Sequence, residues 1–271
     1  MIVDGFNAVL RALVSGYARL FDSLPPLAGL AIASALLGIG MLWVVGKTSN
    51  QQAIERAKKR MQAHLLEMRL YRDEPGLLFR AQGQLIANNF RYVGEMLRPA
   101  MVLTLPMVVL YAHFDSVYGL RPLRVGESAL VTAATELAGT ELALRGSDKF
   151  AVEGSSVSVE ATNEVVWRIR ALAAGASEIQ LETPVGPIPK TAVAGDGETY
   201  LSRGRARSWW QRLLLVPGED RHDVTGVARV DIGYPSRQVG FDGWETHWAI
   251  WFLGISIVTA FLCRGLLGVT I

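Results

Sequence analysis

The residues that most often perform acid–base or metal chemistry are few in this sequence and widely separated. No two of its four histidines, His64, His113, His222 and His247, have the three- or four-residue spacing with which a helix presents a metal-binding pair. The sequence also lacks the H-E-x-x-H, G-x-S-x-G, Walker and dinucleotide-binding motifs. Its densest polar cluster, Glu219 to Asp223, has a composition that can bind a cation but is more typical of a solvated loop.

A catalytic site needs a nucleophile, a base and a stabilising group close together, and the sequence offers no such set. His113 and Asp115 come nearest to one, because they lie at the end of an apolar run where a buried pair can form. The single cysteine, Cys263, excludes a disulfide framework and a cysteine-based zinc site. We therefore predict that the protein is not an enzyme and has no cofactor and no metal site.

Polar residues in and beside the apolar runs are the next candidates for function. Arg98 and Arg264 stand at the ends of two such runs, and hydroxyl groups lie inside them at Thr104, Ser256 and Thr259. One hypothesis is that these five residues line a hydrophilic vestibule in the membrane. The alternative is that the arginines are boundary residues whose guanidinium groups reach the lipid headgroups.

The composition indicates a membrane protein. The 271 residues carry a net charge of +2, which gives no bulk attraction to nucleic acid, so no DNA partner is predicted. The mean hydropathy of +0.25 reflects apolar residues pooled in long runs that one globule cannot bury. We predict three transmembrane helices, at 27–46, 98–117 and 245–265, followed by a tail at 266–271.

The three runs differ in length. The first has 20 residues, which as a helix spans the roughly 30 Å of hydrocarbon. A signal peptide is the alternative for this run, since Ala33 and Ala35 have A-x-A spacing. The second has only 16 uncharged residues, about 24 Å as a helix, so it spans only where the bilayer thins or flanking residues snorkel.

Charge asymmetry predicts the orientation. Residues 47–98 contain ten basic and five acidic side chains, whereas residues 115–245 contain 14 basic and 18 acidic ones. Basic loops stay in the cytoplasm, so we place 47–97 inside, the N-terminus and residues 118–244 outside, and the C-terminus inside.

Helical periodicity dominates the first hundred residues. Apolar residues in 1–26 recur at three- and four-residue steps and predict an amphipathic helix, lying on the outer leaflet or packed on the outer domain. Residues 47–97 carry two seams that predict an antiparallel coiled-coil hairpin: Ile54, Ala57, Met61, His64, Met68 and Tyr71, then Phe79, Gly83, Ile86, Phe90, Val93 and Leu97. Lys58, Lys59 and Arg60 on this hairpin are candidates for docking anionic headgroups or ribosomal RNA, or are simply solvated.

Alternating short runs between 118 and 244 predict an all-β sandwich outside the membrane. One segment interrupts the alternation with arginines and tryptophans: Arg203, Arg205, Arg207, Trp209, Trp210 and Arg212. Such a segment suits the lipid–water boundary or a partner protein, and the alternative is an amphipathic turn packed on the sandwich.

This order of parts resembles the YidC/Oxa insertase superfamily, above all its reduced three-span members. The stretch 96–106, Met-Leu-Arg-Pro-Ala-Met-Val-Leu-Thr-Leu-Pro, is similar to the start of their second span, and 48–58 with 265–271 looks like bacterial membrane proteins of the same layout. The chain departs from the pattern by having no arginine between Arg19 and Lys47 and by carrying its β-domain between the second and third spans.

The resemblance implies a multi-pass protein of the bacterial inner membrane that acts as an insertase or chaperone. Its partners would be the lipid bilayer, client membrane proteins and, through the basic hairpin, the ribosome. The alternative is a structural or assembly subunit of a larger membrane complex, which binds its partners through the outer β-domain.

Overall fold

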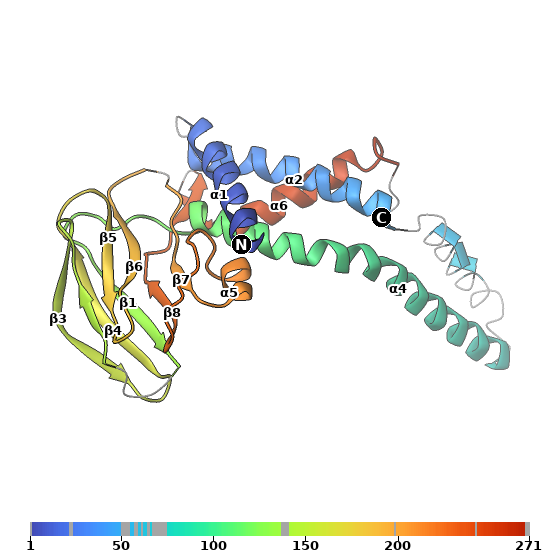
Figure 1. Cartoon of the computed structure of the whole chain (residues 1–271). Coiled ribbons are helices and arrows are strands. Elements are labelled where there is room, and N and C mark those ends of the chain that lie inside the picture. The colour runs from blue at the N-terminus through green and yellow to red at the C-terminus, as the bar shows by residue number, and fades with distance from the viewer. Residues whose placement is uncertain are drawn as a thin grey trace. The chain divides into compact units, whose positions relative to one another are not determined.

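The computed structural model describes residues 2–21, 24–49, 55–56, 59–60, 62–63, 66, 75–136, 141–197, 199–241 and 243–268. The chain divides into two compact units, one of residues 1–30 and 108–251 and the other of residues 31–107 and 252–271. The first unit holds the β-domain with the helix α1 (Ile2–Leu20), and the second is helical. Figure 1 colours the elements from blue at the N-terminus to red at the C-terminus.

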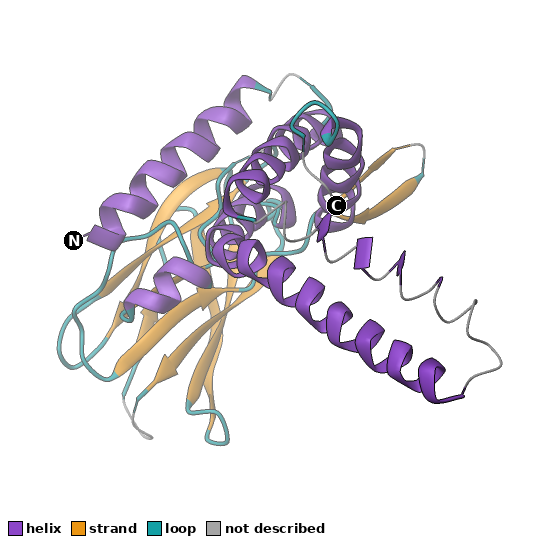
Figure 2. Ribbon diagram, turned by 90° about the vertical axis from the view of Figure 1, so that its right-hand side faces the viewer, coloured by secondary structure: helices purple, strands orange, loops and turns teal. Residues whose placement is uncertain are grey.

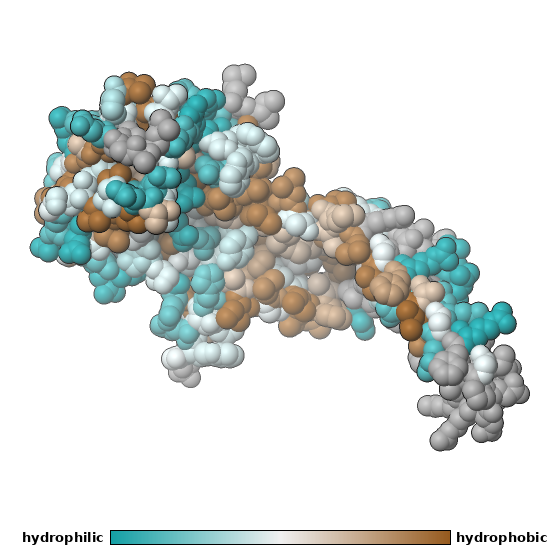
Figure 3. Space-filling view, turned by 90° about the horizontal axis from the view of Figure 1, so that it is seen from below, coloured by the Kyte–Doolittle hydropathy of each residue, from teal (hydrophilic) through white to brown (hydrophobic). Residues whose placement is uncertain are grey.

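Two helical segments are long and apolar enough to cross a membrane. One is the whole of α2 (Pro26–Thr48), and the other is Pro99–Gly119 at the end of α4. Large hydrophobic side chains are exposed on both, among them Leu36, Trp43, Met101 and Leu105. Figure 3 shows hydrophobic surface gathered over the helices. These side chains are apolar without being buried, as expected of helices that face lipid.

The helix α4 (Pro75–Phe114) is one uninterrupted helix of 40 residues (Figure 1). The sequence predicts a hairpin arm ending at 97 and a separate span beginning at 98, but the structure joins them. Pro99 and Pro106 lie inside the helix, where each lacks the amide hydrogen that would bond the preceding turn. The helix continues as the π-helix η1 (Asp115–Gly119), so the apolar segment reaches 21 residues.

The predicted hairpin is described only in part. Its first seam, Ile54 to Tyr71, lies outside the described residues. The second seam lies on α4, where Ile86, Phe90, Val93 and Leu97 are exposed at three- and four-residue steps. The coiled coil therefore stays a prediction.

The third apolar helix is shorter than predicted. The helix α6 (Trp248–Cys263) has 16 residues, about 24 Å, and residues 244–247 form a strand instead. This strand, β10 (Trp244–His247), pairs with β9 (Gln238–Phe241). Gly240 permits the pairing, because an added Cβ there would meet the backbone of Trp244 and Glu245.

The β-domain encloses one hydrophobic core between two antiparallel sheets, and β9 with β10 forms a third, separate sheet of two strands. Its other strands are β1 (Ser128–Thr135), β2 (Ala143–Arg145), β3 (Phe150–Val159), β4 (Glu164–Ala171), β5 (Gly175–Glu182), β6 (Ile188–Ala194), β7 (Gly204–Ala206) and β8 (Val227–Ile232). The larger sheet has the order β3-β4-β1-β8-β7 and the smaller one β2-β5-β6.

Alternation along the strands builds this core. Trp167 and Ile169 on β4 are buried while Arg168 and Arg170 between and beyond them are exposed. Ile179 and Leu181 on β5 contribute from the other sheet. The period of two that predicts strands thus also selects the side chains that meet between the sheets.

The amphipathic helix α1 packs against the β-domain with a side that combines polar and smaller apolar residues. Asn7, Val14 and Ala18 are its buried residues. Figure 2 shows α1, which starts at the label N, beside the strands. This is the second of the two placements considered from sequence, and the side that faces the protein is not the one with the large hydrophobic residues.

Hydrogen bonds attach the ends of α4 and α6 to the β-domain within the first unit. The amide of Leu201 donates to the carbonyl of Ser116 (2.7 Å), and that of Arg237 donates to Gly119 (2.9 Å). Asp115 accepts from the indole of Trp248 (3.0 Å) and forms an ion pair with Arg203 (3.4 Å). The π-helix therefore joins the C-terminal end of α4 to the β-domain and to Trp248 of α6.

Candidate functional site

The arginine and tryptophan segment forms an edge strand followed by a short helix. The strand β7 lies at the edge of the larger sheet, and Gly204 and Ala206 on it are buried. An added Cβ at Gly204 would collide with the carboxylate of Asp231. Glycine and alanine therefore face the core, and the arginines that alternate with them point away from it.

The three alternating arginines reach different partners. Arg203 pairs with Asp115, as above. Arg205 donates to the carbonyls of Pro189 (2.7 Å) and Asp220 (3.0 Å), and Arg207 pairs with Glu136 (2.9 Å). These contacts bind the edge strand to the loops around it, so Arg205 has a structural role that the sequence did not indicate.

The helix α5 (Trp209–Leu214) carries three of the predicted interface residues, and it buries Arg212 while it exposes Trp209 and Trp210. Arg212 is only 4% exposed, pairs with Asp4 of α1, and accepts through its carbonyl a hydrogen bond from the Asn7 amide (3.0 Å). Burial lowers the pKa of Arg212. Arg212 thus fixes α1 to the β-domain and is not available to a partner.

The two tryptophans of α5 point outward instead. Trp209 is 60% and Trp210 45% exposed. Exposed tryptophans on a folded domain are typical of protein or lipid contacts, because the ring combines a large apolar area with one donor.

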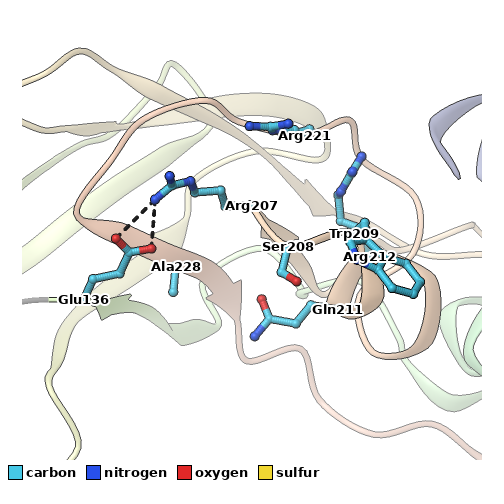
Figure 4. Close-up of a pocket in the computed structure, with 8 residues that line it drawn as sticks. All are labelled: Glu136, Arg207, Ser208, Trp209, Gln211, Arg212, Arg221 and Ala228. Carbon is cyan, nitrogen blue, oxygen red and sulfur yellow. Dashed lines mark hydrogen bonds and ion pairs between the residues drawn. The ribbon is translucent and has the colours of Figure 1, made fainter. Parts of the chain in front are cut away.

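A cleft of about 360 Å³ opens beside α5. Figure 4 shows its lining, with Arg207 directed at Glu136 across the strand and Arg221 above them: Glu136, Arg207, Ser208, Trp209, Gln211, Arg212, Arg221 and Ala228. The lining offers guanidinium, hydroxyl, amide and indole groups, which suit binding. It contains no nucleophile next to a base.

The polar cluster after Gly218 differs from the predicted solvated loop. The Glu219 side chain is 11% exposed and pairs with Lys190, which is itself 1% exposed. His222 is also buried. Only the remaining residues of the cluster, such as the Arg221–Asp223 pair, lie at the surface.

The buried pair was missed from the sequence. Lys190 occupies an inward position of β6 between Ile188 and Ala192, and its ammonium also donates to the carbonyl of Ser202 (2.8 Å). Burial lowers the pKa of Lys190 and raises that of Glu219, and the attraction between the two opposes both changes. A lysine flanked by inward apolar residues is the signal that could have located it.

The predicted vestibule residues lie on α4 (Arg98 and Thr104), on α6 (Ser256 and Thr259) and in the turn after α6 (Arg264). Thr104 donates to the carbonyl of Ala100 (2.8 Å), and the buried Ser256 donates to Phe252 (2.5 Å). Thr259 is half-buried on α6, and the Arg264 guanidinium lies 5.7 Å from the Phe261 ring centroid. The Arg98 side chain lies outside the described parts of the structure.

The remaining candidates are placed as follows. Lys58 lies outside the described residues, Arg60 is exposed, and Lys59 pairs with Glu55 at 2.8 Å. His113 is buried, with its Nδ1 3.0 Å from the Val109 carbonyl. Asp115 contacts Trp248 and Arg203 instead of His113, so His113 and Asp115 are not paired as a catalytic dyad would be.

Among the described residues, no group of three or more histidine, cysteine, aspartate or glutamate side chains is placed to hold a metal ion. Comparison of the chain with family models, with curated proteins and with solved structures found no match.

Proposed function

We propose that this is an integral membrane protein with α2, the second half of α4 and α6 in the bilayer and the β-sandwich outside. The lengths of α2 and Pro99–Gly119 support this, as do the exposed hydrophobic side chains on all three helices. α6 is about 24 Å long, so a bilayer around it must thin locally. The basic balance of 47–98 places that segment inside, in a bacterial inner membrane as the resemblance implies.

Within that membrane the protein acts as an insertase for other membrane proteins. The observation that carries this proposal is the single helix α4, which joins an exposed arm of mixed polar and apolar residues to an apolar span. An arm continuous with a span can receive a client segment outside the bilayer and deliver it to the lipid beside the short α6. Desolvation of the polar flank of a client is the barrier, and thinned lipid together with Arg98 and Arg264 lowers it.

Reconstitution tests this function. Proteoliposomes with the variant R98A/R264A should insert a reporter with a short outer tail about tenfold more slowly than wild type, which corresponds to roughly 1.4 kcal/mol of barrier. The matched control is R80A/R91A, two exposed arginines of the α4 arm. Equal rates for wild type and a folded R98A/R264A would contradict the vestibule.

The basic residues of the predicted hairpin, 47–97, allow a second test of the proposal. If exposed residues such as Lys59 and Arg60 dock ribosomal RNA, ribosome binding in detergent should weaken steeply as salt rises, because each contact releases counterions from phosphate. Salt-insensitive binding would instead indicate a protein partner.

The second candidate function is an assembly subunit, which the exposed Trp209 and Trp210 beside the cleft favour. The variant W209S/W210S should fold normally and lose co-purifying membrane subunits, while L172S, an exposed residue after β4, should keep them. Retention of a fixed set of subunits by W209S/W210S would count against this role.

A further inference from the structure

The helix α1 has an apolar side that is exposed in the described part of the chain. Four of its large hydrophobic residues are exposed: Phe6 49%, Val9 59%, Leu13 64% and Leu20 78%. They follow one another at helical spacing and so form one continuous stripe. A helix that packs on a soluble domain normally buries such a stripe, and this one does the reverse.

The opposite side of α1 is bound to the β-domain by polar contacts. Asp4 pairs with Arg212, Asn7 donates to the Arg212 carbonyl, and the Arg11 guanidinium donates to the carbonyl of Gly218. These bonds fix the rotation of α1 about its own axis. The apolar stripe is therefore held away from the β-domain.

The distribution of charge on α1 indicates what the stripe meets. Asp4 is the only acidic residue in Ile2–Leu20, and it faces Arg212. The last turn of α1 carries Arg19, which is exposed on the flank of the helix between the stripe and the buried side. An apolar face with a cation and no acid is suited to a bilayer surface, where the long arginine side chain reaches the phosphates.

The connection to α2 places the stripe at that surface. Only residues 21–25 separate α1 from α2, a helix long and apolar enough to span. The Tyr17 hydroxyl donates to the Gly29 carbonyl in the first turn of α2 (2.7 Å), so the two helix ends are joined. If α2 enters the bilayer at its first turn, the end of α1 lies at the headgroups.

We propose that α1 lies in the outer lipid–water interface with Phe6, Val9, Leu13 and Leu20 toward the acyl chains, and that its polar side holds the β-domain at the membrane. The occupant of the stripe is the bilayer. This inference rests on the proposed membrane-spanning role of α2 and does not depend on insertase activity.

Spin-label accessibility in nanodiscs tests the proposal on the full chain. Single labels are placed in a C263S background at V9C and L13C on the stripe, with V157C on β3 as the water control and L36C on α2 as the lipid control; all four positions are exposed. Labels at 9 and 13 should be several-fold less accessible to a water-soluble nickel complex than the label at 157. They should also be several-fold more accessible to oxygen than that label.

Each other outcome has a distinct meaning. Nickel accessibility at 9 and 13 equal to that at 157 would overturn the proposal, and the spanning role of α2 would stand if the label at 36 remained lipid-protected. Water access at 36 as well would overturn both. Low access to nickel and oxygen together at 9 and 13 would mean that protein, a partner or a second copy, covers the stripe, which also overturns the proposal.

Discussion

At the scale of single residues, the β-domain contains an ion pair, Lys190–Glu219, whose desolvation cost offsets much of the favourable attraction between its charges. Moving Lys190 and Glu219 out of water is unfavourable, and their mutual attraction and the hydrogen bonds from Lys190 to the carbonyls of Ser202 and Thr191 offset this cost. The side chain of the neighbouring Asp231 is 19% exposed, and its partial burial raises its pKa while Arg229 opposes the change. Each charged group in this polar cluster offsets the desolvation cost of a neighbour of opposite charge, so the loss of one group leaves another without its partner.

A double-mutant cycle measures that compensation. K190M and E219Q should each destabilise the protein by about 3–5 kcal/mol, because each leaves its partner buried and unmatched. The double variant K190M/E219Q should lose less than the sum of the two. Melting temperatures in one detergent provide the comparison, and additive losses would mean that the two groups do not interact.

A second residue prediction concerns acid stability. Hydrogen bonds from Arg121 (2.8 Å) and then from the Arg124 amide lower the pKa of Glu127 from 4.5 to about 2. Because the folded pKa lies below the ordinary value, the stabilisation is complete above pH 4.5 and is lost as the pH falls toward 2.

The variant E127Q should therefore lose about 1 kcal/mol at pH 7, a modest amount because both side chains are 29% exposed. The difference in melting temperature between E127Q and wild type should disappear between pH 4.5 and 2. E160Q, in the exposed turn after β3, is the control. A difference that stays constant with pH would exclude this pair as its source.

At the scale of elements, α2 and α6 pack closely inside the second unit. An added Cβ at Gly38 would lie 2.7 Å from the carbonyl oxygen of Ser256. Small residues permit such contacts between helices in lipid, where van der Waals packing replaces the hydrophobic effect. The contact sets how near α6 lies to α2.

The variant G38V should push these helices apart and destabilise the protein by about 1–3 kcal/mol, the usual cost of overpacking. G40V is matched in residue type and helix, and an added Cβ at Gly40 meets no described atom within 4 Å. Thermal unfolding in detergent should separate the two variants. Equal melting temperatures would show that the Gly38 contact does not limit the packing.

At the scale of the whole molecule, the β-domain core lies entirely between Leu120 and Tyr234. Both sheets and their shared core are thus complete without the spans, which is what independent folding requires. The contacts of α5 are different, since Arg212 pairs with Asp4 of α1, which lies outside residues 120–243.

Residues 120–243 expressed alone should therefore fold as a soluble β-rich monomer in which α5 is less protected than in the full chain. Amide exchange should be slow in β1 and β4 in both forms and faster at 209–214 in the isolated domain. A domain that fails to fold, by circular dichroism, would mean that α1 or the spans complete the core. Equal protection of α5 in both forms would contradict the anchoring role of Arg212.

Several features follow from the sequence because they depend only on neighbouring residues. The apolar run at 27–46 and the alternating runs between 118 and 244 each indicate elements from their own side chains, and the structure has α2 at Pro26–Thr48 and strands such as β1, β4 and β8 in the second region. The strand β6 was missed because Pro189 and Lys190 break its apolar pattern. The exposure of Trp209 and Trp210 matches their selection as interface residues.

Tertiary structure decided the rest. Periodicity shows that α1 has two sides but not which side the β-domain takes, because that depends on Asp4 meeting Arg212, about two hundred residues later. Because of the same contact, Arg212 is not part of the predicted interface. In the same way, the Glu219 side chain is not solvated as predicted but pairs with Lys190. A charged side chain is buried only where a distant opposite charge compensates its desolvation, and no local pattern specifies that partner.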